Sequence, residues 1–316
     1  MPLQPSIDKI TEISRVLLSI AGRYLVFAGA LYLFFYVWRR RTYWYSKIQQ
    51  RYPESKHILR EIVYSFFTIL IFGAVILLVI YASKQHLTGI YPNISDKGYP
   101  YYFLSIGLMI LMHDTYFYWT HRVMHWKPLF KLMHKTHHLS TNPTPFAAYA
   151  FHPLEAVVEI GIVPLIAFTI PYHGTALTIF SLYSLLLNVT GHLGYELFPQ
   201  GFTTHKLFKW HNTSTHHNMH HRLIKCNYGL YFNIWDRLMG TNHPDYEKSF
   251  EQVVEKREKV KCKGDPGLLS DRTGYGVTFS FFTPAVSGLT TSILLMSIWY
   301  FIPGSSVLTT GILSFG

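Results

Sequence analysis

The sequence predicts an all-α, polytopic membrane protein in which transmembrane helices carry a helical, histidine-rich cap on the cytoplasmic side. Of the 316 residues, 49% are hydrophobic and only 14% are charged, whereas about a quarter of the residues of a soluble domain are charged. Several uncharged segments reach the roughly 20 residues that a helix needs to cross a bilayer. Eighteen histidines occur, and fifteen of them fall between His113 and His221.

Four segments have the length and composition of membrane spans. They cover residues 20–38, 62–82, 101–119 and 277–302. The first contains one charge, Arg23, and the third is apolar until His113 and Asp114. Long uncharged segments repeated in one chain favour membrane helices over buried helices of a large soluble core.

A central pair of segments, residues 154–170 and 175–191, is less regular. The first contains Glu155, Glu159 and Pro164, and the sequence from Pro171 to Gly174 indicates a turn between the two. The sequence leaves open whether this pair forms two thin spans or a hairpin that enters one leaflet and returns.

The basic residues of the loops predict the orientation. Seven of them lie between the first two spans: Arg39, Arg40, Arg41, Lys47, Arg51, Lys56 and Arg60. The loop at residues 83–100 has only Lys84 and Lys97. Because cytoplasmic loops are enriched in Lys and Arg, we expect the first loop and the histidine-rich segments beyond residue 120 to face the cytoplasm, in a bacterial inner membrane or the endoplasmic reticulum.

The formal net charge of +11 is explained by this topology and by affinity for anionic lipid headgroups. A nucleic-acid partner is not expected, because no recognisable nucleic-acid-binding fold accompanies the charge. The chain divides into N-terminal membrane spans and loops at 1–100, the histidine-rich region, and a charged cytoplasmic segment with a C-terminal membrane span at 246–316.

Three histidine clusters have the spacing of metal ligands. They are His121 with His125, His134 with His137 and His138, and His217 with His220 and His221. Residues three or four apart share one face of a helix, so we expect each cluster to present its imidazoles in one direction. Neutral imidazole binds zinc, iron, copper and nickel. Eight imidazoles exceed the needs of one ion and favour two, with His192 as a further candidate ligand.

Other residue types narrow the kind of metal site. Only Cys226 lies near the clusters, which disfavours a cysteine-rich structural zinc site, and the scarcity of carboxylates disfavours a carboxylate-rich di-iron bundle. Metal-bound histidines usually donate their second N–H to a carboxylate or carbonyl. The candidates for such support are His113, Asp114, His152, Glu155, Glu196, His216 and Asp236. We expect Asp236 to hold a ligand histidine or to pair with a basic neighbour such as Arg237.

These motifs resemble the fatty acid hydroxylase/sterol desaturase superfamily of integral-membrane di-iron oxygenases. The segment from His113 to His125 is similar to its first histidine box with an aromatic lead-in, and the other two clusters are similar to its second and third boxes. Phe151-His152-Pro153-Leu-Glu155 resembles the segment after the second box. Asn227-Tyr-Gly229 and the sequence from Trp235 to Thr241 resemble the close of its catalytic domain, so the similarity covers roughly residues 101–245.

The resemblance implies an O2-dependent oxidoreductase with two iron ions, which zinc can replace in purified protein. It implies nine ligands, all histidines: His121, His125, His134, His137, His138, His192, His217, His220 and His221. Electrons would come from a separate cytochrome b5-like or ferredoxin-like carrier and its reductase. The substrate would be a sterol-like or fatty-acyl or alkyl lipid, hydroxylated or desaturated at an unactivated C–H position. Glu196 stands where fatty acid hydroxylases have another histidine, which disfavours fatty-acid 2-hydroxylation.

Two other classes of protein have similar histidine content. A histidine-rich membrane metal transporter or metal-binding protein would place ionisable residues near the middle of its spans, whereas these clusters lie at and beyond one edge. A histidine-box acyl-chain desaturase of the other superfamily shares the boxes but lacks the closing motifs at 227–229 and 235–237. No acid–base residue beyond the metal ligands is predicted to take part in catalysis.

Overall fold

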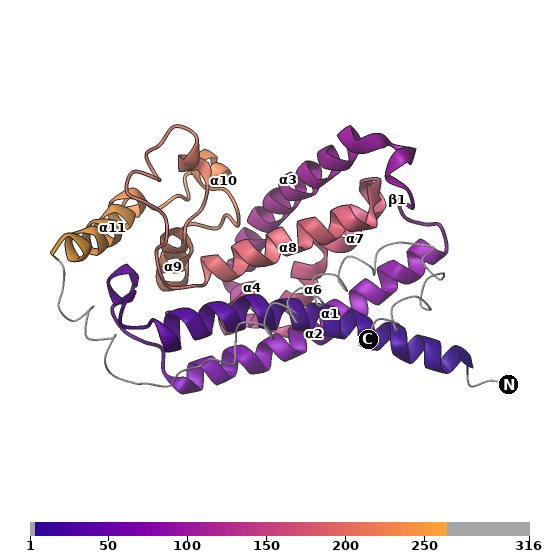
Figure 1. Cartoon of the computed structure of the whole chain (residues 1–316), viewed down its shortest axis with the longest axis horizontal. Helices are drawn as coiled ribbons and strands as arrows, with labels where there is room; N and C mark the ends of the chain where they lie inside the picture. The colour runs from indigo at the N-terminus through magenta and orange to yellow at the C-terminus, as the bar shows by residue number, and fades with distance from the viewer. Residues whose placement is uncertain (1–3, 264–316) are drawn as a thin grey trace, which may run out of the picture.

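The computed structural model describes residues 4–263, whose regular secondary structure is almost entirely helical (Figure 1). The predicted all-α fold is therefore confirmed, while the predicted span at 277–302 lies outside the described residues. In chain order the main elements are α1 (Gln4–Tyr32), the π-helical η1 (Leu33–Trp38), α2 (Ser55–Lys84), β1 (Ile90–Tyr91), α3 (Gly98–Met124), α4 (Lys127–Leu129), the π-helical η4 (Phe130–His134), α5 (Lys135–His138), α6 (Pro153–Ile160), α7 (Ile162–Thr169), β2 (Tyr172–His173), α8 (Gly174–Gly191), α9 (Ser214–Leu223), α10 (Ile234–Leu238) and α11 (Tyr246–Lys263). Short 3₁₀ turns are η2 (Trp44–Ser46), η3 (Ile94–Asp96), η5 (Pro145–Tyr149) and η6 (Phe208–Trp210).

Long apolar helices form the body of the protein. Among the described residues, three helical stretches are long and apolar enough to cross a bilayer: Asp8–Trp38, Ser55–Lys84 and Gly174–Gly191. Large apolar side chains such as Leu25, Phe66 and Leu78 are more than half exposed on these helices, as expected where the surrounding medium is lipid. The chain is therefore an integral membrane protein.

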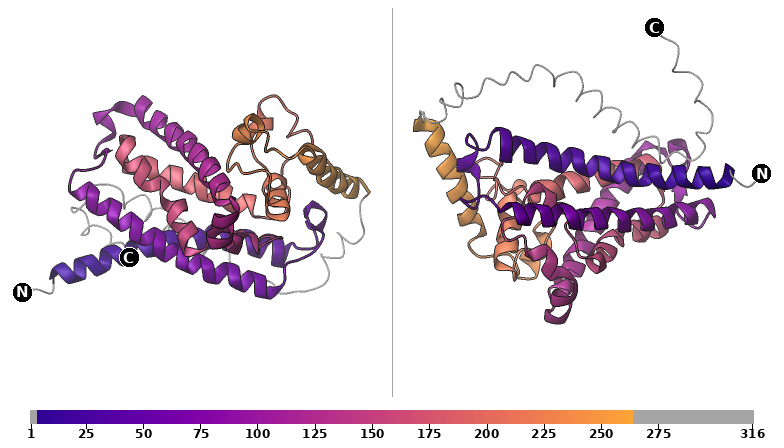
Figure 2. Two further views of the ribbon diagram at one scale, coloured as in Figure 1. Left: turned by 180° about the vertical axis from the view of Figure 1, so that it is seen from behind. Right: turned by 90° about the horizontal axis from the view of Figure 1, so that it is seen from below.

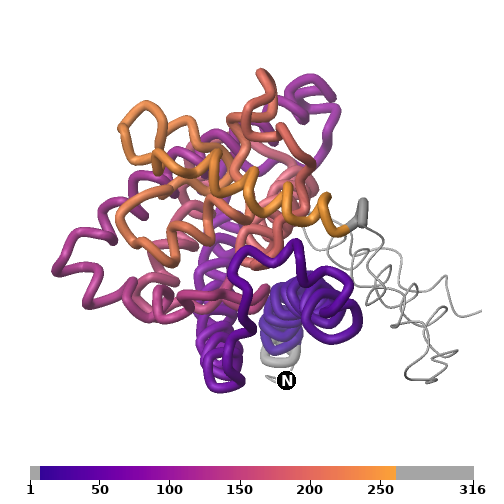
Figure 3. Tube along the Cα trace, turned by 90° about the vertical axis from the view of Figure 1, so that its left-hand side faces the viewer, coloured from indigo at the N-terminus to yellow at the C-terminus, as the bar shows by residue number. Residues whose placement is uncertain are grey.

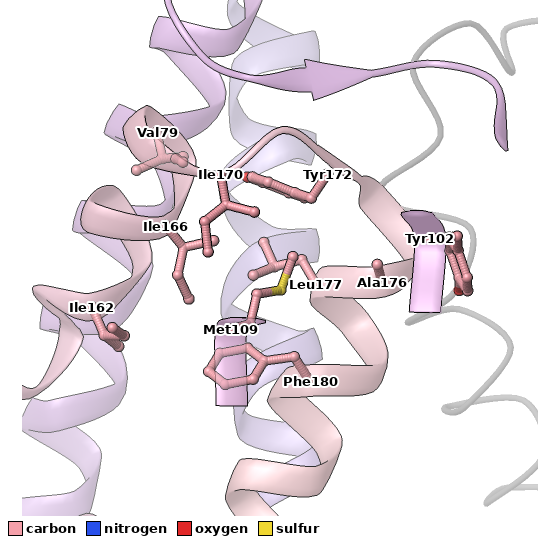
Figure 4. Close-up of a cluster of buried hydrophobic side chains, with 11 residues drawn as sticks. Val79, Tyr102, Met109, Ile162, Ile166, Ile170, Tyr172, Ala176, Leu177 and Phe180 are labelled. Atoms are coloured by element: carbon pink, nitrogen blue, oxygen red, sulfur yellow. The ribbon is translucent and has the colours of Figure 1, made fainter. Parts of the chain in front are cut away.

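The helices α1 and α2 run antiparallel and in contact along the length of the molecule, and α3 and α8 pack together beside them (Figures 1 and 2). A buried apolar cluster joins α2, α3, α7 and α8. Met109, Leu177 and Phe180 point into its centre in Figure 4, with Ile166 facing them from α7. Burial of these side chains fixes the relative positions of helices that are far apart in the sequence.

The central pair of predicted segments folds differently in its two halves. Residues 175–191 form the continuous α8, but 154–170 is broken into α6 and α7, with eight residues in each. Gly161 lies between the two helices. A side chain at this position would collide with the Tyr116 hydroxyl, which would lie 2.5 Å from its Cβ. An eight-residue helix is about 12 Å long, so neither half alone crosses a bilayer core of about 30 Å. The predicted span at 101–119 lies within α3, which is not among the three stretches named above.

Two opposite ends of the bundle carry the connecting loops. At one end the first loop contacts the histidine-bearing segments, since Ile48 N donates to Gly194 O at 3.1 Å and Gln49 Nε2 to Asn218 Oδ1 at 2.9 Å. Figure 3 looks onto this end, where α9 and α11 also lie. At the other end, β1 pairs in parallel with β2, with Ile90 opposite Tyr172.

Lys47, one of the basic residues of the first loop, is buried and only 1% exposed. Its ammonium lies 4.9 Å from the Tyr36 ring centre and 4.8 Å from that of Tyr195, a cation–π arrangement. Burial lowers the pKa of Lys47 to about 7. The contact between Lys47 and the Tyr195 ring packs the first loop against the segment that follows His192.

The end-to-end arrangement predicts the result of cysteine labelling. In a background lacking Cys226 and Cys262, cysteines placed at the exposed positions Arg51 and Lys131 should react from one side of the membrane, and one at Lys97 only from the other. A membrane-impermeant maleimide applied to sealed vesicles of both orientations measures this. Labelling of positions 51 and 131 from opposite sides would contradict the arrangement.

Candidate metal centre

Nine histidines from distant parts of the chain converge at one end of the bundle. Their side-chain nitrogens form two groups, within each of which the nitrogens lie no more than 4.8 Å apart. Group one is His121, His125, His134, His138 and His220; group two is His137, His192, His217 and His221. Eight of the nine are buried, and His125 is half-buried. These are the nine histidines that the sequence predicts as ligands, and either group could hold a metal ion.

The second and third clusters divide between the two groups. His134 and His138, one turn apart, join group one, while His137 joins group two. The third cluster divides in the opposite sense, because His217 and His221 join group two and His220 joins group one. We expected each cluster to present its imidazoles in one direction. The structure differs because residues at i and i+4 share a face from which i+3 is rotated, so each cluster bridges both groups.

The helix ends decide where the remaining ligands lie. His121 is in the last turn of α3 with His125 as its C-cap, and His192 is the C-cap of α8. Both helices run toward the same end of the bundle (Figure 1). The end of α8 packs on the third cluster, since a Cβ at Gly191, before His192, would be in ordinary van der Waals contact with the His217 ring at 3.7 Å.

The imidazoles face one another through their Nε2 atoms at short range. In group one, His134 Nε2 lies 3.0 Å from that of His121 and 3.1 Å from that of His138. In group two, His192 Nε2 lies 2.9 Å from that of His217 and 3.2 Å from that of His221. Ligands placed 2.0–2.1 Å from a shared ion at tetrahedral or octahedral angles are separated by about 2.9–3.4 Å. The spacing therefore fits one metal ion in each group.

The hydrogen bonds of the Nδ1 atoms explain why the space between the Nε2 atoms favours a cation. The Nδ1 atoms of His121 and His220 donate to the carbonyl oxygens of Tyr228 and Cys226, at 2.8 and 2.7 Å. These oxygens only accept hydrogen bonds, so the proton of each neutral ring resides on Nδ1 and its Nε2 exposes a lone pair. Lone pairs facing one another in a buried space are unfavourable, and a shared cation removes the conflict.

Two further acceptors orient rings in the same way. Glu155 Oε1 lies 2.7 Å from His134 Nδ1, and both side chains are buried. His192 Nδ1 donates to the Asn188 carbonyl at 2.8 Å. Glu155 is thus the predicted supporting carboxylate that contacts a candidate ligand directly.

Burial keeps the rings in the form that binds metal. The pKa values of His217, His220 and His221 lie well below the ordinary value, first because the charged form is desolvated and second because neighbouring imidazoles would repel it. Neutral imidazole is the metal-binding form of histidine, so these rings need not lose a proton when metal binds near neutral pH.

The other predicted supporting residues hold the backbone around the groups. Asp114 Oδ1 accepts from the amides of Tyr231 and Phe232, and His113 Nδ1 lies 2.8 Å from the Tyr231 hydroxyl. Glu196 accepts from the amide and hydroxyl of Thr215, in the first turn of α9. The remaining two also lie outside the groups: His152 caps the start of α6, and His216 packs against the Tyr246 ring.

Asp236 acts through the backbone rather than on a ligand histidine. Its carboxylate accepts from Tyr228 N at 2.8 Å, Gly229 N at 2.7 Å and Thr241 Oγ1 at 2.7 Å. The expected pairing with Arg237 is wrong, because Arg237 instead pairs with Glu247 at 2.7 Å. Asp236 also approaches His216, at 3.6 Å, which belongs to neither group. It therefore positions the turn whose Tyr228 carbonyl orients His121.

The motif from Asn227 to Gly229 has a steric explanation. Asn227 has φ of 59° and is buried, with Nδ2 donating to His216 O and Oδ1 accepting from His243 N. A Cβ at Gly229 would lie 2.4 Å from Phe232 O and 2.9 Å from Asp236 Oδ2. The sequence contains this motif, but it did not predict that backbone carbonyls, rather than side chains, orient His121, His192 and His220. The turn at Asn227–Gly229 is the sequence signal for one of these carbonyls, that of Tyr228, which orients His121.

Comparisons with known proteins agree with the site. Residues 106–241, which include all nine histidines and Asp236, match the family model described as fatty acid hydroxylase. The Delta(7)-sterol 5(6)-desaturase ERG3B of Gibberella zeae is 28% identical over 80% of this chain and 77% of its own length. Delta(7)-sterol 5(6)-desaturase erg3C of Aspergillus fumigatus is 26% identical over 84% of this chain and 89% of its length. Lathosterol oxidase of Rattus norvegicus is 35% identical over 51% of this chain and 52% of its length. No solved structure matches this chain.

The role of Asp236 predicts a loss of stability without loss of any metal ligand. In Asp236→Asn one of the two acceptor oxygens is replaced by an NH2 group that faces a backbone or hydroxyl donor, so we expect destabilisation by about 1–3 kcal/mol. Thermal unfolding of the purified protein in detergent measures it. Asp245→Asn, at an exposed carboxylate, is the control. Equal unfolding midpoints for both variants and the parent protein would contradict this role.

Proposed function

Because the chain belongs to the fatty acid hydroxylase/sterol desaturase superfamily, we propose that it introduces a double bond at the 5(6) position of a Δ7-sterol. The chain is a membrane-bound oxidoreductase that modifies a lipid. The names of its relatives support the sterol and the position, since two Delta(7)-sterol 5(6)-desaturases match over 80% and 84% of this chain and a lathosterol oxidase over 51%.

The observation that carries this proposal is the convergence of nine neutral imidazoles in two buried groups. We propose that each group holds one iron ion, with His121, His125, His134, His138 and His220 around the first and His137, His192, His217 and His221 around the second. Bound iron would supply the electron transfer to O2 that oxidises an unactivated C–H bond, chemistry that acid–base side chains do not supply.

The electron balance of desaturation requires a second source of electrons. Removing a hydrogen from each of two neighbouring carbons forms the double bond and releases two electrons and two protons. Reduction of O2 to two water molecules takes four electrons and four protons. We propose that a separate cytochrome b5-like or ferredoxin-like carrier with its reductase supplies the other two electrons, and that water supplies the other two protons.

The protein's own side chains provide geometry and exclude water. Glu155 and the carbonyls of Asn188, Cys226 and Tyr228 hold the Nδ1 protons of four rings, so each Nε2 stays free for metal. Phe151 covers group two, with its ring centre 5.2 Å from that of His137. These contacts keep the site ordered and shield it from bulk solvent.

The placement of the site follows from charge and connectivity. The basic first loop contacts the histidine-bearing segments, and basic loops face the cytoplasm. We therefore propose a multi-pass topology with the metal centre at the cytoplasmic face. We also propose that residues 101–245 are the catalytic region, that 1–100 supply N-terminal membrane helices and that 246–316 form a charged segment followed by a membrane span.

Sterol turnover tests the proposed reaction. Membranes containing the protein, supplied with O2, NADH or NADPH and a reducing partner, should convert lathosterol into a product lighter by two hydrogens with a new 5(6) double bond. Gas chromatography with mass spectrometry identifies it. A product heavier by one oxygen would contradict desaturation, and modification of fatty acids but not sterols would contradict the substrate class.

Metal analysis tests the two-ion assignment. Purified protein should contain about two transition-metal ions per chain, as nine imidazole ligands permit. His137→Ala removes a ligand of group two only, so we expect a loss of about one ion together with loss of turnover. His205→Ala, at an exposed histidine outside both groups, should change neither. Full metal content in His137→Ala would show that the ligand assignment is wrong, whereas bound zinc in place of iron would be compatible with it.

A further inference from the structure

The loop between the first two membrane helices lies against the metal centre, at the end of the bundle that Figure 3 faces. Its residues 46–51 include no ligand candidate, and they lie outside residues 106–241, the part of the chain that matches the family model. These six residues nevertheless form hydrogen bonds with three segments that carry candidate ligands. The loop is therefore placed to influence the geometry of the site.

The first of these segments is the one that follows His192. Ile48 N donates to Gly194 O at 3.1 Å, and Glu196 N donates to Ser46 O at 2.8 Å. The two partners of the loop lie two and four residues beyond His192. Backbone bonds in both directions fix the loop relative to the end of α8, which carries this ligand.

The Gln49 side chain joins the other two segments to the loop. Its Nε2 donates to Thr141 O at 2.7 Å and to Asn218 Oδ1 at 2.9 Å. Thr141 follows the second histidine cluster by three residues, and Asn218 lies in α9 within the third. A side-chain amide carries two N–H donors, so this one group can satisfy both acceptors. Gln49 is therefore a crosslink between the segments of the second and third clusters.

Contacts on both sides of Gln49 hold the loop itself in place. Two residues before it, the buried Lys47 lies between the rings of Tyr36 and Tyr195. Two residues after it, the carbonyl of Arg51 accepts from Asn142 Nδ2 at 2.9 Å. A crosslinking side chain positions its partners only where its own backbone is fixed, and these contacts meet that condition.

The loop contacts bear on every ligand candidate of group two. His137 lies four residues before Thr141, His192 lies two before Gly194, and Asn218 lies between His217 and His221. Group one also takes His121 and His125 from the end of α3, and the Tyr228 carbonyl orients His121. Loss of the crosslink should therefore disturb group two more than group one.

The separation that Gln49 bridges is the one on which group two depends. The ring centres of His137 and His221, from the second and third clusters, lie 4.6 Å apart. A displacement of α9 relative to the second cluster would change the spacing of these ligands directly. Groups that hold ligands in position without touching the metal typically change metal affinity by about 10–100-fold when removed.

We propose that Gln49 is a positioning residue for the metal ion of group two, because it fixes the second histidine cluster relative to the third. The proposal rests on the proposed occupancy of one ion in each group. It assigns to the loop between the first two membrane helices a part in building the metal centre.

Metal titration of the full-length protein tests this without turnover. Metal-free protein in detergent is titrated with Co²⁺, whose visible absorption reports coordination by imidazole, and bound cobalt is measured after equilibrium dialysis. The parent protein should bind two ions. Gln49→Ala should bind one of them about 10–100-fold more weakly and the other with the parent affinity. The absorption lost at limiting Co²⁺ should match that lost in His137→Ala, which identifies the weakened ion as that of group two.

Two further variants sharpen the comparison. Gln49→Glu keeps the size of the side chain but replaces the donating NH2 group by an oxygen that faces two acceptors, so it should weaken the same ion at least as much. Gln85→Ala, at an exposed glutamine at the opposite end of α2, should titrate as the parent protein. Asn218→Ala should also weaken the group-two ion, and adding it to Gln49→Ala should cause little further loss, because the two side chains act through one contact.

Elution volume and helical circular dichroism report whether each variant is folded, and Gln49→Glu carries the test if Gln49→Ala is not. Equal weakening of both ions, weakening of the group-one ion alone, or parent affinities in the folded variants would overturn the proposal. Parent affinities in the Gln49 variants, together with desaturation of lathosterol by the parent protein, reject this inference alone. Selective loss of the group-two ion in these variants, without desaturation by the parent protein, rejects only the proposed reaction.

Discussion

The arrangement of this protein depends on one constraint, which is that nine neutral imidazoles turn their Nε2 atoms toward one another at one end of the bundle, four of them with an acceptor at Nδ1. His121 and His134 both have an acceptor at Nδ1, so the 3.0 Å between their Nε2 atoms is too short for two lone pairs with nothing between them. Much of the surrounding structure holds this arrangement in place by binding the outward Nδ1 atoms. Metal binding and folding of this end of the bundle are therefore coupled, because an ion converts mutual repulsion into shared coordination.

The elements that bind the outward nitrogens come from very different places. Glu155 extends from the short α6, Asn188 belongs to the long α8, and Tyr228 lies in a loop fixed by Asp236. The same loop is tied back to α3, since the Thr241 and Tyr118 hydroxyls lie 3.0 Å apart and Trp235 Nε1 donates to Thr115 Oγ1. The closing motif thus completes the site without contributing a metal ligand.

The position of the site at the ends of membrane helices reconciles two opposing requirements. Ligand rings need polar acceptors and tight turns, which are costly within a bilayer, while a lipid substrate must be reached from the apolar phase. The helices α3 and α8 satisfy both because their apolar lengths end in His121 and His192. A cavity lined by Phe151 lies between the apolar helices and the histidine groups.

The sequence by itself determined the helical membrane class and predicted the eight clustered histidines as ligands, because both depend on composition and local spacing. A long apolar segment has few alternatives to a membrane helix, and imidazoles at i, i+3 and i+4 cluster whatever the rest of the chain does. Helix geometry turns the i+3 ring away from the rings at i and i+4, but only the tertiary structure decided which rings of the second and third clusters meet in each group. It also decided that Asp236 acts on backbone amides, that residues 154–170 break at Gly161, and that Gln49 contacts Asn218, 169 positions away in the chain. Contacts between residues so distant in sequence arise from packing, and local patterns contain no record of them.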